Sequence, residues 1–177
     1  MSKLIALLRG INIGGNHPLP MKELSALLTD MGLREVRTYL QSGNVVFSSA
    51  AKDRVALAAK ISSAIEAQYG FAPQVLLLDA AELRKAMANN PYPEAEANPK
   101  ALSLLFLAEA PPHPDLKALE ALKAGSERFK LIGRVFYLHA PEGFGRSKLA
   151  ARAEKLLGVA ASGRNWNTVC KLAEMVA

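Results

Sequence analysis

The order of apolar segments constrains the fold of this chain more than any other feature. Short apolar runs alternate with segments in which apolar residues recur at helical spacing. The order strand, helix, strand pair, helix, strand and helix occurs twice along the 177 residues. It predicts an α+β fold of two duplicated ferredoxin-like (split βαββαβ) units, each with an extra C-terminal helix. The predicted segments are 4–8, 21–31, 36–40, 45–48, 54–69, 75–78 and 80–88 in the first half, and 102–107, 115–123, 128–132, 135–139, 147–157, 159–162 and 166–176 in the second.

The composition changes between the two halves. Residues 89–100 are rich in proline and asparagine and have no apolar periodicity, which is typical of a connecting segment. We therefore predict a first ferredoxin-like unit at 1–90, a connector at 91–100 and a second unit with its C-terminal helix at 101–177.

A glycine-rich segment follows the first predicted strand. Residues 9–15, here called the glycine loop, contain an arginine, an asparagine and three glycines. Glycine allows close approach of a ligand to bare backbone N–H groups, and a guanidinium binds carboxylate or phosphate. The alternative is that the glycines only adopt the backbone angles of a tight exit from the strand. The candidate ligand-binding residues here are Arg9, Gly10, Asn12, Gly14 and Gly15.

The first predicted hairpin carries a second polar segment, Gln41-Ser42-Gly43-Asn44, here called the hairpin turn. In a split βαββαβ unit the first two strands run parallel and the third lies between them. The glycine loop and the hairpin turn should therefore lie at the same edge of the sheet, where Gln41, Ser42 and Asn44 are candidate ligand-binding residues. Without the neighbouring glycine loop, these residues would be assigned only a structural role in a hairpin, because Gly and Asn tolerate the positive φ of its turn.

A third polar segment lies at the start of the last predicted helix. Asn165 is a suitable N-cap, and a helix start presents unpaired N–H groups with a partial positive charge. Arg164 and Asn167 stand beside it, and Trp166 could stack on a base. These four residues complete the candidate ligand-binding set. The competing interpretation makes Trp166 a core anchor of the last helix.

Charge and composition bear on possible partners. The formal net charge is +6 and the pI about 9.5, which favours a small anion or a nucleic acid, although the charge could serve solubility alone. The single cysteine rules out an intrachain disulfide and, with only three histidines, argues against a metal site. No apolar run approaches the roughly 20 residues of a membrane span. We expect a cytoplasmic protein without a membrane partner.

The three polar segments also carry a family resemblance. The chain resembles, nearly end to end, an uncharacterised and mainly bacterial family known as a domain of unknown function (serial number 1697). The resemblance implies two related ferredoxin-like halves and no particular activity. Ser162 stands where the family often has threonine, which keeps a hydroxyl at that position. The matching motifs are Arg9-Gly10-Ile11-Asn12-Ile13-Gly14-Gly15, the segment 38–47, Asn90-Pro91, Ser147-Lys148-Leu149 and the segment 164–169.

Three function classes fit these observations. The first is a binding module for a phosphate-bearing ligand, a nucleotide or RNA, at the edge formed by residues 9–15 and 41–44. The second is an enzyme that stabilises an oxyanion or phosphate through N–H, Arg and Asn donors, although no general base is obvious. The third is a scaffold in which the same residues form buried hydrogen-bond networks.

Overall fold

The computed structural model describes all 177 residues and divides into two compact units. Unit 1 comprises residues 1–84 and 172–177, and unit 2 comprises residues 85–171. The division falls within helix α3 (Ala80–Ala88) and within helix α6 (Trp166–Val176). The division of the chain into a first unit at 1–90, a connector at 91–100 and a second unit at 101–177 stays a prediction.

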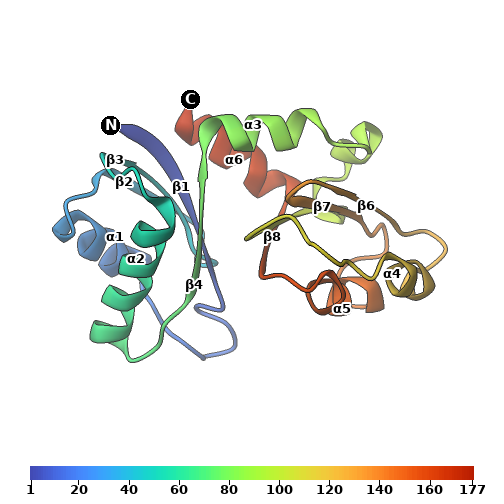
Figure 1. The fold of residues 1–177 in the computed structure, drawn as a ribbon, viewed down its shortest axis with the longest axis horizontal. Coiled ribbons are helices and arrows are strands. Elements are labelled where there is room, and N and C mark those ends of the chain that lie inside the picture. The colour runs from blue at the N-terminus through green and yellow to red at the C-terminus, as the bar shows by residue number, and fades with distance from the viewer. The chain divides into compact units, whose positions relative to one another are not determined.

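Unit 1 is built on a four-stranded antiparallel sheet with the order β2-β3-β1-β4, the order of a ferredoxin-like unit. Helices α1 and α2 cover one face of this sheet (Figure 1). The predicted fold class is confirmed for this half. The elements are β1 (Ser2–Arg9), α1 (Met21–Asp30), β2 (Arg34–Tyr39), β3 (Asn44–Ser49), α2 (Arg54–Tyr69) and β4 (Gln74–Asp79).

Strand β1 is the central strand and is buried on both faces. Leu4, Ala6 and Leu8 belong to the core cluster beneath α1 and α2. Ile5 and Leu7 point to the opposite face and are also fully buried. Burial on both faces explains why this segment is a continuous apolar run instead of an alternating one.

Unit 2 repeats the topology, with a sheet of order β6-β7-β5-β8 whose strand pairs are all antiparallel. Helices α4 and α5 contribute Leu119, Leu149 and Leu157 to its core. The elements are β5 (Leu102–Leu107), α4 (Leu116–Leu122), β6 (Arg128–Ile132), β7 (Val135–His139), α5 (Lys148–Leu157) and β8 (Ala161–Asn165).

The last strand differs from the prediction. We expected a strand at 159–162, but β8 extends to Asn165. Backbone pairing explains the difference, because Arg164 lies opposite Leu104 and Asn165 opposite Ser103 in the ladder with β5. The polar residues at this end of β8 gave no strand pattern in the sequence. Because of the pairing with β5, Arg164 lies within the sheet and not in a loop.

The predicted connector is ordered into two short 3₁₀-helices, η1 (Pro93–Ala97) and η2 (Pro99–Ala101). Each begins with proline, whose fixed φ suits the first position of a helix. Tyr92 and Ala95 are buried, so the segment packs against its unit even though it lacks periodicity.

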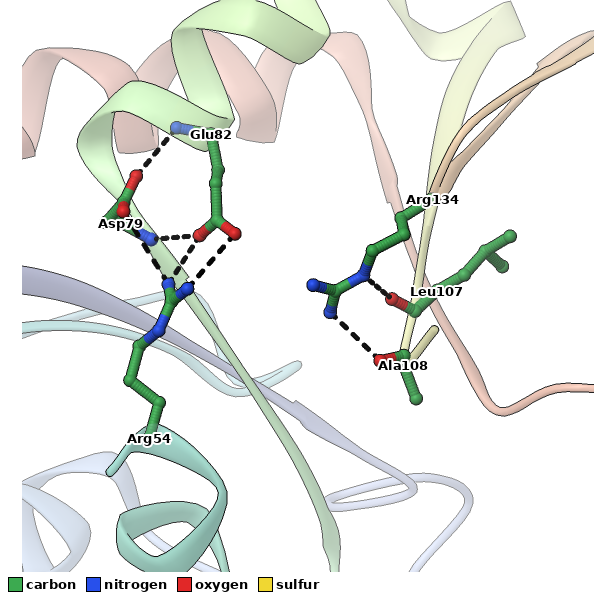
Figure 2. Close-up of polar contacts among 6 residues, drawn as sticks. All are labelled: Arg54, Asp79, Glu82, Leu107, Ala108 and Arg134. Atoms are coloured by element: carbon green, nitrogen blue, oxygen red, sulfur yellow. Dashed lines mark hydrogen bonds and ion pairs between the residues drawn. The ribbon is translucent and has the colours of Figure 1, made fainter. Parts of the chain in front are cut away.

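Helix α3 begins with a reciprocal cap between Asp79 and Glu82. The Glu82 N–H donates to Asp79 Oδ1 at 2.7 Å, and the Asp79 N–H donates to Glu82 Oε2 at 2.8 Å. The Arg54 guanidinium, from α2, contacts Glu82 at 2.5 Å and Asp79 at 3.7 Å (Figure 2). This cluster joins the start of α2 to the start of α3 through residues that all belong to unit 1.

None of the helices combines the length and the apolar character that a bilayer crossing requires.

Candidate functional site

The glycine loop and the hairpin turn meet at one edge of the unit 1 sheet, as predicted from the topology. The Asn12 Nδ2 group donates a hydrogen bond to the Gln41 carbonyl at 2.8 Å. The Leu8 N–H donates to the Gly43 carbonyl, also at 2.8 Å. We call the region formed by residues 9–17 and 40–44 the loop edge.

Asn12 holds the loop edge together. Its Nδ2 group also donates to the Leu19 carbonyl at 2.9 Å, and its Oδ1 accepts from the Leu19 N–H at 2.7 Å. Its φ of 54° lies in the left-handed region, which asparagine tolerates better than most residues. Both amide hydrogens are therefore used within the chain, and Asn12 positions the two loops.

The tip of the glycine loop is a two-residue turn. Ile13 and Asn16 exchange backbone hydrogen bonds of 3.2 and 2.8 Å. The two residues between them, Gly14 and Gly15, have φ of 55° and 79°, and positive φ at both positions is what a type I′ turn requires. Both glycines are exposed, and neither donates its N–H to another group of the chain.

His17 closes the base of this turn. Its Nδ1 lies 3.0 Å from the Gly10 carbonyl oxygen, which can only accept, so Nδ1 carries the proton. Its ring stacks on Phe71 with centroids 4.5 Å apart. The imidazole thus fixes the loop and is held in one orientation.

The hairpin turn contains two groups that are fully enclosed. A Cβ at Gly43 would lie 2.8 Å from the Leu8 Cβ atom and 3.0 Å from Ile11 Cδ1, and φ there is 95°. Asn44 is completely buried and donates from Nδ2 to the Tyr39 carbonyl at 2.8 Å and to Ser42 Oγ at 3.1 Å. These contacts are structural.

All but one of the remaining candidates at the loop edge face solvent; the exception, Gly10, is half-buried. A guanidinium, two peptide N–H groups, a primary amide and a hydroxyl therefore lie on the exposed part of this edge, supplied by Arg9, Gly14, Gly15, Gln41 and Ser42. This set can donate hydrogen bonds to an anion, and it includes no carboxylate.

The equivalent edge of unit 2 is joined by different chemistry. The Leu107 N–H donates to the Arg134 carbonyl at 2.9 Å, which matches the bond between Leu8 and Gly43 in unit 1. Here, however, the hairpin side chain reaches back: Arg134 donates to the carbonyls of Leu107 and Ala108 at 3.2 and 3.0 Å (Figure 2). An arginine replaces the glycine loop and its asparagine, so the two edges are asymmetric.

The third polar segment belongs to unit 2. Arg164 lies in β8 with 9% of its surface exposed, donates to the Gly163 carbonyl at 2.8 Å, and burial lowers its pKa to about 10. Asn165 caps α6 by accepting from the Thr168 N–H at 3.0 Å, and Trp166 is buried. Asn167 is exposed on the first turn of α6. The indole therefore offers little open surface for stacking.

One cavity of unit 1, of about 230 Å³, lies away from the predicted residues, at a bulge in β2. Its polar side chains are engaged with the protein: Lys3 donates to the Ala177 carbonyl at 3.3 Å and Arg37 to the Met175 carbonyl. The third pair is Ser48, which donates to Glu35 at 2.8 Å. The first two contacts connect the sheet to the C-terminal end of α6, and the third connects two neighbouring strands.

A cluster of titratable groups in unit 2 was not predicted. Arg128 forms an ion pair with Glu94 at 2.5 Å and lies 4.3 Å from the centre of the Tyr92 ring. It also approaches His139 Nδ1 at 3.0 Å. The members come from β6, β7, η1 and the residue before η1, so no local motif could have revealed the cluster. Its groups are engaged with one another, which indicates a structural role.

This cluster predicts a pH dependence of stability. Burial and, to a lesser extent, the Arg128 charge lower the pKa of His139 below its ordinary 6.5. The unfolded chain therefore binds more protons between the two pKa values, and the free energy of unfolding should decrease as the pH falls from about 7.5 to about 5.5. His139→Asn should flatten this dependence in urea titrations. His113→Asn is the control, and an equal effect of both substitutions would contradict the assignment.

Comparisons with known proteins give a family and a fold. The family described as "Protein of unknown function (DUF1697)" matches residues 1–137. No curated protein matches the chain. A solved structure, that of the conserved bacterial protein SP0830 from Streptococcus pneumoniae, is similar with a TM-score of 0.73 and 25% sequence identity, over 99% of each chain.

Proposed function

We propose a function for the chain, which belongs to the DUF1697 family of unknown function: it binds a phosphate-bearing ligand at the loop edge of unit 1. The observation that carries the proposal is the hydrogen bond from Asn12 to Gln41, which holds an exposed glycine turn beside the hairpin turn. The ligand would contact the exposed groups of this edge, and Asn12 and Asn44 would position them.

The donors at the loop edge suit phosphate. The Gly14 and Gly15 peptides carry no side chain, and an added Cβ at either position would meet nothing within 4 Å. A phosphate oxygen could thus approach their N–H groups closely. Arg9 ends the neighbouring strand, and a guanidinium forms strong charge-assisted hydrogen bonds with phosphate.

The electrostatic setting points the same way. Residues 9–17 and 40–44 contain no aspartate or glutamate, so these two segments contribute no carboxylate that would repel an anion. The net charge of +6 adds a weak attraction for anions over longer distances.

A thermal-shift screen with pyrophosphate, mononucleotides, sugar phosphates and short RNAs tests the proposal. A ligand that binds only the folded chain raises its apparent stability in proportion to the logarithm of its concentration. We expect a rise with at least one of these compounds, and the RNA and mononucleotide arms separate a polymer from a small ligand. No shift with any of them at millimolar concentration would overturn the proposal.

Arg9→Gln gives a residue-level prediction. Loss of one charge-assisted hydrogen bond should weaken binding of the compound found in the screen by about tenfold, or about 1.4 kcal/mol. Lys60→Gln removes the same charge from the exposed surface of α2 and is the matched control. Isothermal titration calorimetry checks both variants. Equal weakening would mean that only net charge matters.

A further inference from the structure

Two large apolar side chains are exposed at the loop edge. Ile13 is 62% exposed and Leu40 is 53% exposed. Ile13 follows Asn12 in the chain and Leu40 precedes Gln41, so each lies one residue from the hydrogen bond that joins the two loops. Each of the two joined loops therefore carries an exposed apolar side chain close to this hydrogen bond, and Ile13 directly precedes Gly14.

The backbone of Leu40 is unusual for a leucine. Its φ of 59° lies in the left-handed region, where a Cβ atom crowds the following carbonyl and where Gly and Asn are the common residues. The exposed side chain recovers little of this cost, because half of it remains in water.

The other non-glycine residues with positive φ all have side-chain contacts that offset the strain. Asn12 hydrogen-bonds to Leu19 and Gln41, His17 to Gly10, and Glu35 accepts from Ser48. The Leu40 side chain is apolar and can form no such bond. An exposed and strained hydrophobic residue at a candidate site points to a role in contact with a ligand.

We infer that the ligand is a phosphate ester that carries an apolar ring, and that the ring packs against Ile13 and Leu40 while the phosphate meets the glycine turn. The inference rests on the proposed function and names its ligand class. Ile13 and Gly14 are neighbours with Cα atoms about 3.8 Å apart, so a molecule of mononucleotide size reaches both groups. Enzymes that bind a single nucleobase stack it between aromatic or apolar side chains, so Ile and Leu can pack against its flat face.

Calorimetry with two probes tests the inference on the full chain. Pyrophosphate offers only the charged part, and adenosine monophosphate offers phosphate and ring. Wild type should bind the monophosphate at least tenfold more tightly than pyrophosphate. Leu40→Asn should weaken the monophosphate about tenfold, leave pyrophosphate unchanged, and leave the thermal midpoint of the free protein equal or higher, because asparagine tolerates positive φ.

A second variant and a control complete the design. Ile13→Ala should also weaken binding of the monophosphate and leave binding of pyrophosphate unchanged. This variant leaves residue 40 unchanged, so its effect cannot come from the backbone conformation there. Val55→Asn alters an equally apolar residue that is 83% exposed on α2, and it should change neither affinity.

The outcomes separate the two claims. Wild type that binds neither probe overturns this inference, and it overturns the proposed function as well only if the sugar phosphates and short RNAs of the screen also give no shift. Wild type that binds pyrophosphate as tightly as the monophosphate, or an affinity for the monophosphate that is unchanged in both variants, overturns the apolar contact alone. A parallel loss of both probes in Leu40→Asn would assign Leu40 to loop structure and also overturn it.

Discussion

Replacing Asn12 by aspartate is expected to lower the free energy of unfolding by about 3 kcal/mol at neutral pH. The two side chains have nearly the same shape, so the change isolates the amide hydrogens. Nδ2 now donates to the carbonyls of Leu19 and Gln41 at 2.9 and 2.8 Å. A carboxylate oxygen there would replace two hydrogen bonds with repulsion between an anion and two carbonyl dipoles. Urea unfolding followed by circular dichroism measures the loss.

Asn16→Asp is the matched control for this prediction. Asn16 is exposed in the same loop, and its backbone alone pairs with Ile13. The same substitution there should change stability by less than about 0.5 kcal/mol. The penalty at Asn12 should shrink as the pH falls toward about 4, because the carbonyl repulsion raises the pKa of the new carboxyl in the folded chain and a protonated carboxyl can donate one hydrogen bond. Similar losses for both variants would show that Asn12 does not join the loops.

Replacing Gly43 by alanine is expected to cost about 3 kcal/mol or more. The added Cβ would lie 2.8 Å from the Leu8 Cβ atom, and Leu8 is fully buried in the central strand, so its backbone cannot yield easily. The φ of 95° adds backbone strain. The hairpin turn would have to move away from β1, which would also strain the hydrogen bond between Asn12 and Gln41.

Gly14→Ala separates the steric cause from the loss of a glycine as such. Gly14 also has positive φ, at 55°, but an added Cβ would meet nothing within 4 Å. Its cost should be only about 1 kcal/mol, the usual penalty of a left-handed alanine. Differential scanning calorimetry should therefore show a clearly larger decrease in Tm for Gly43→Ala. Equal decreases would mean that the close approach to Leu8 does not limit the hairpin.

The fold was predictable because the spacing of apolar residues along the chain indicates which segments form helices and strands with a buried face. In α2 the buried residues Leu57, Ile61 and Ile65 recur at helical spacing, and the predicted bounds match the observed helix. Topology then predicted that the glycine loop and the hairpin turn meet. The full length of β8 could not be predicted in this way. Its pairing with β5 uses backbone groups, while Arg164 and Asn165 give its sequence a polar pattern.

The sequence could not predict which residues of the loop edge form internal hydrogen bonds and which face solvent. Sequence alone does not tell whether an asparagine side chain hydrogen-bonds to backbone carbonyls of other residues or faces solvent. Asn12 and Asn44 both bond to such carbonyls. The left-handed conformation of Leu40 was equally hidden, because leucine gives no signal for it. Such features depend on distances between segments that are far apart in sequence, which only the folded chain defines.

The most direct test of the central claim is a titration of the ¹⁵N-labelled chain with adenosine monophosphate, followed by heteronuclear NMR. We predict saturable shifts of the Gly14 and Gly15 amides and of the Arg9 side-chain Nε–H signal, while the exposed amides of α2 stay unchanged. Saturable binding that shifts only residues outside 9–17 and 40–44, or a spectrum without saturable shifts, would contradict the account.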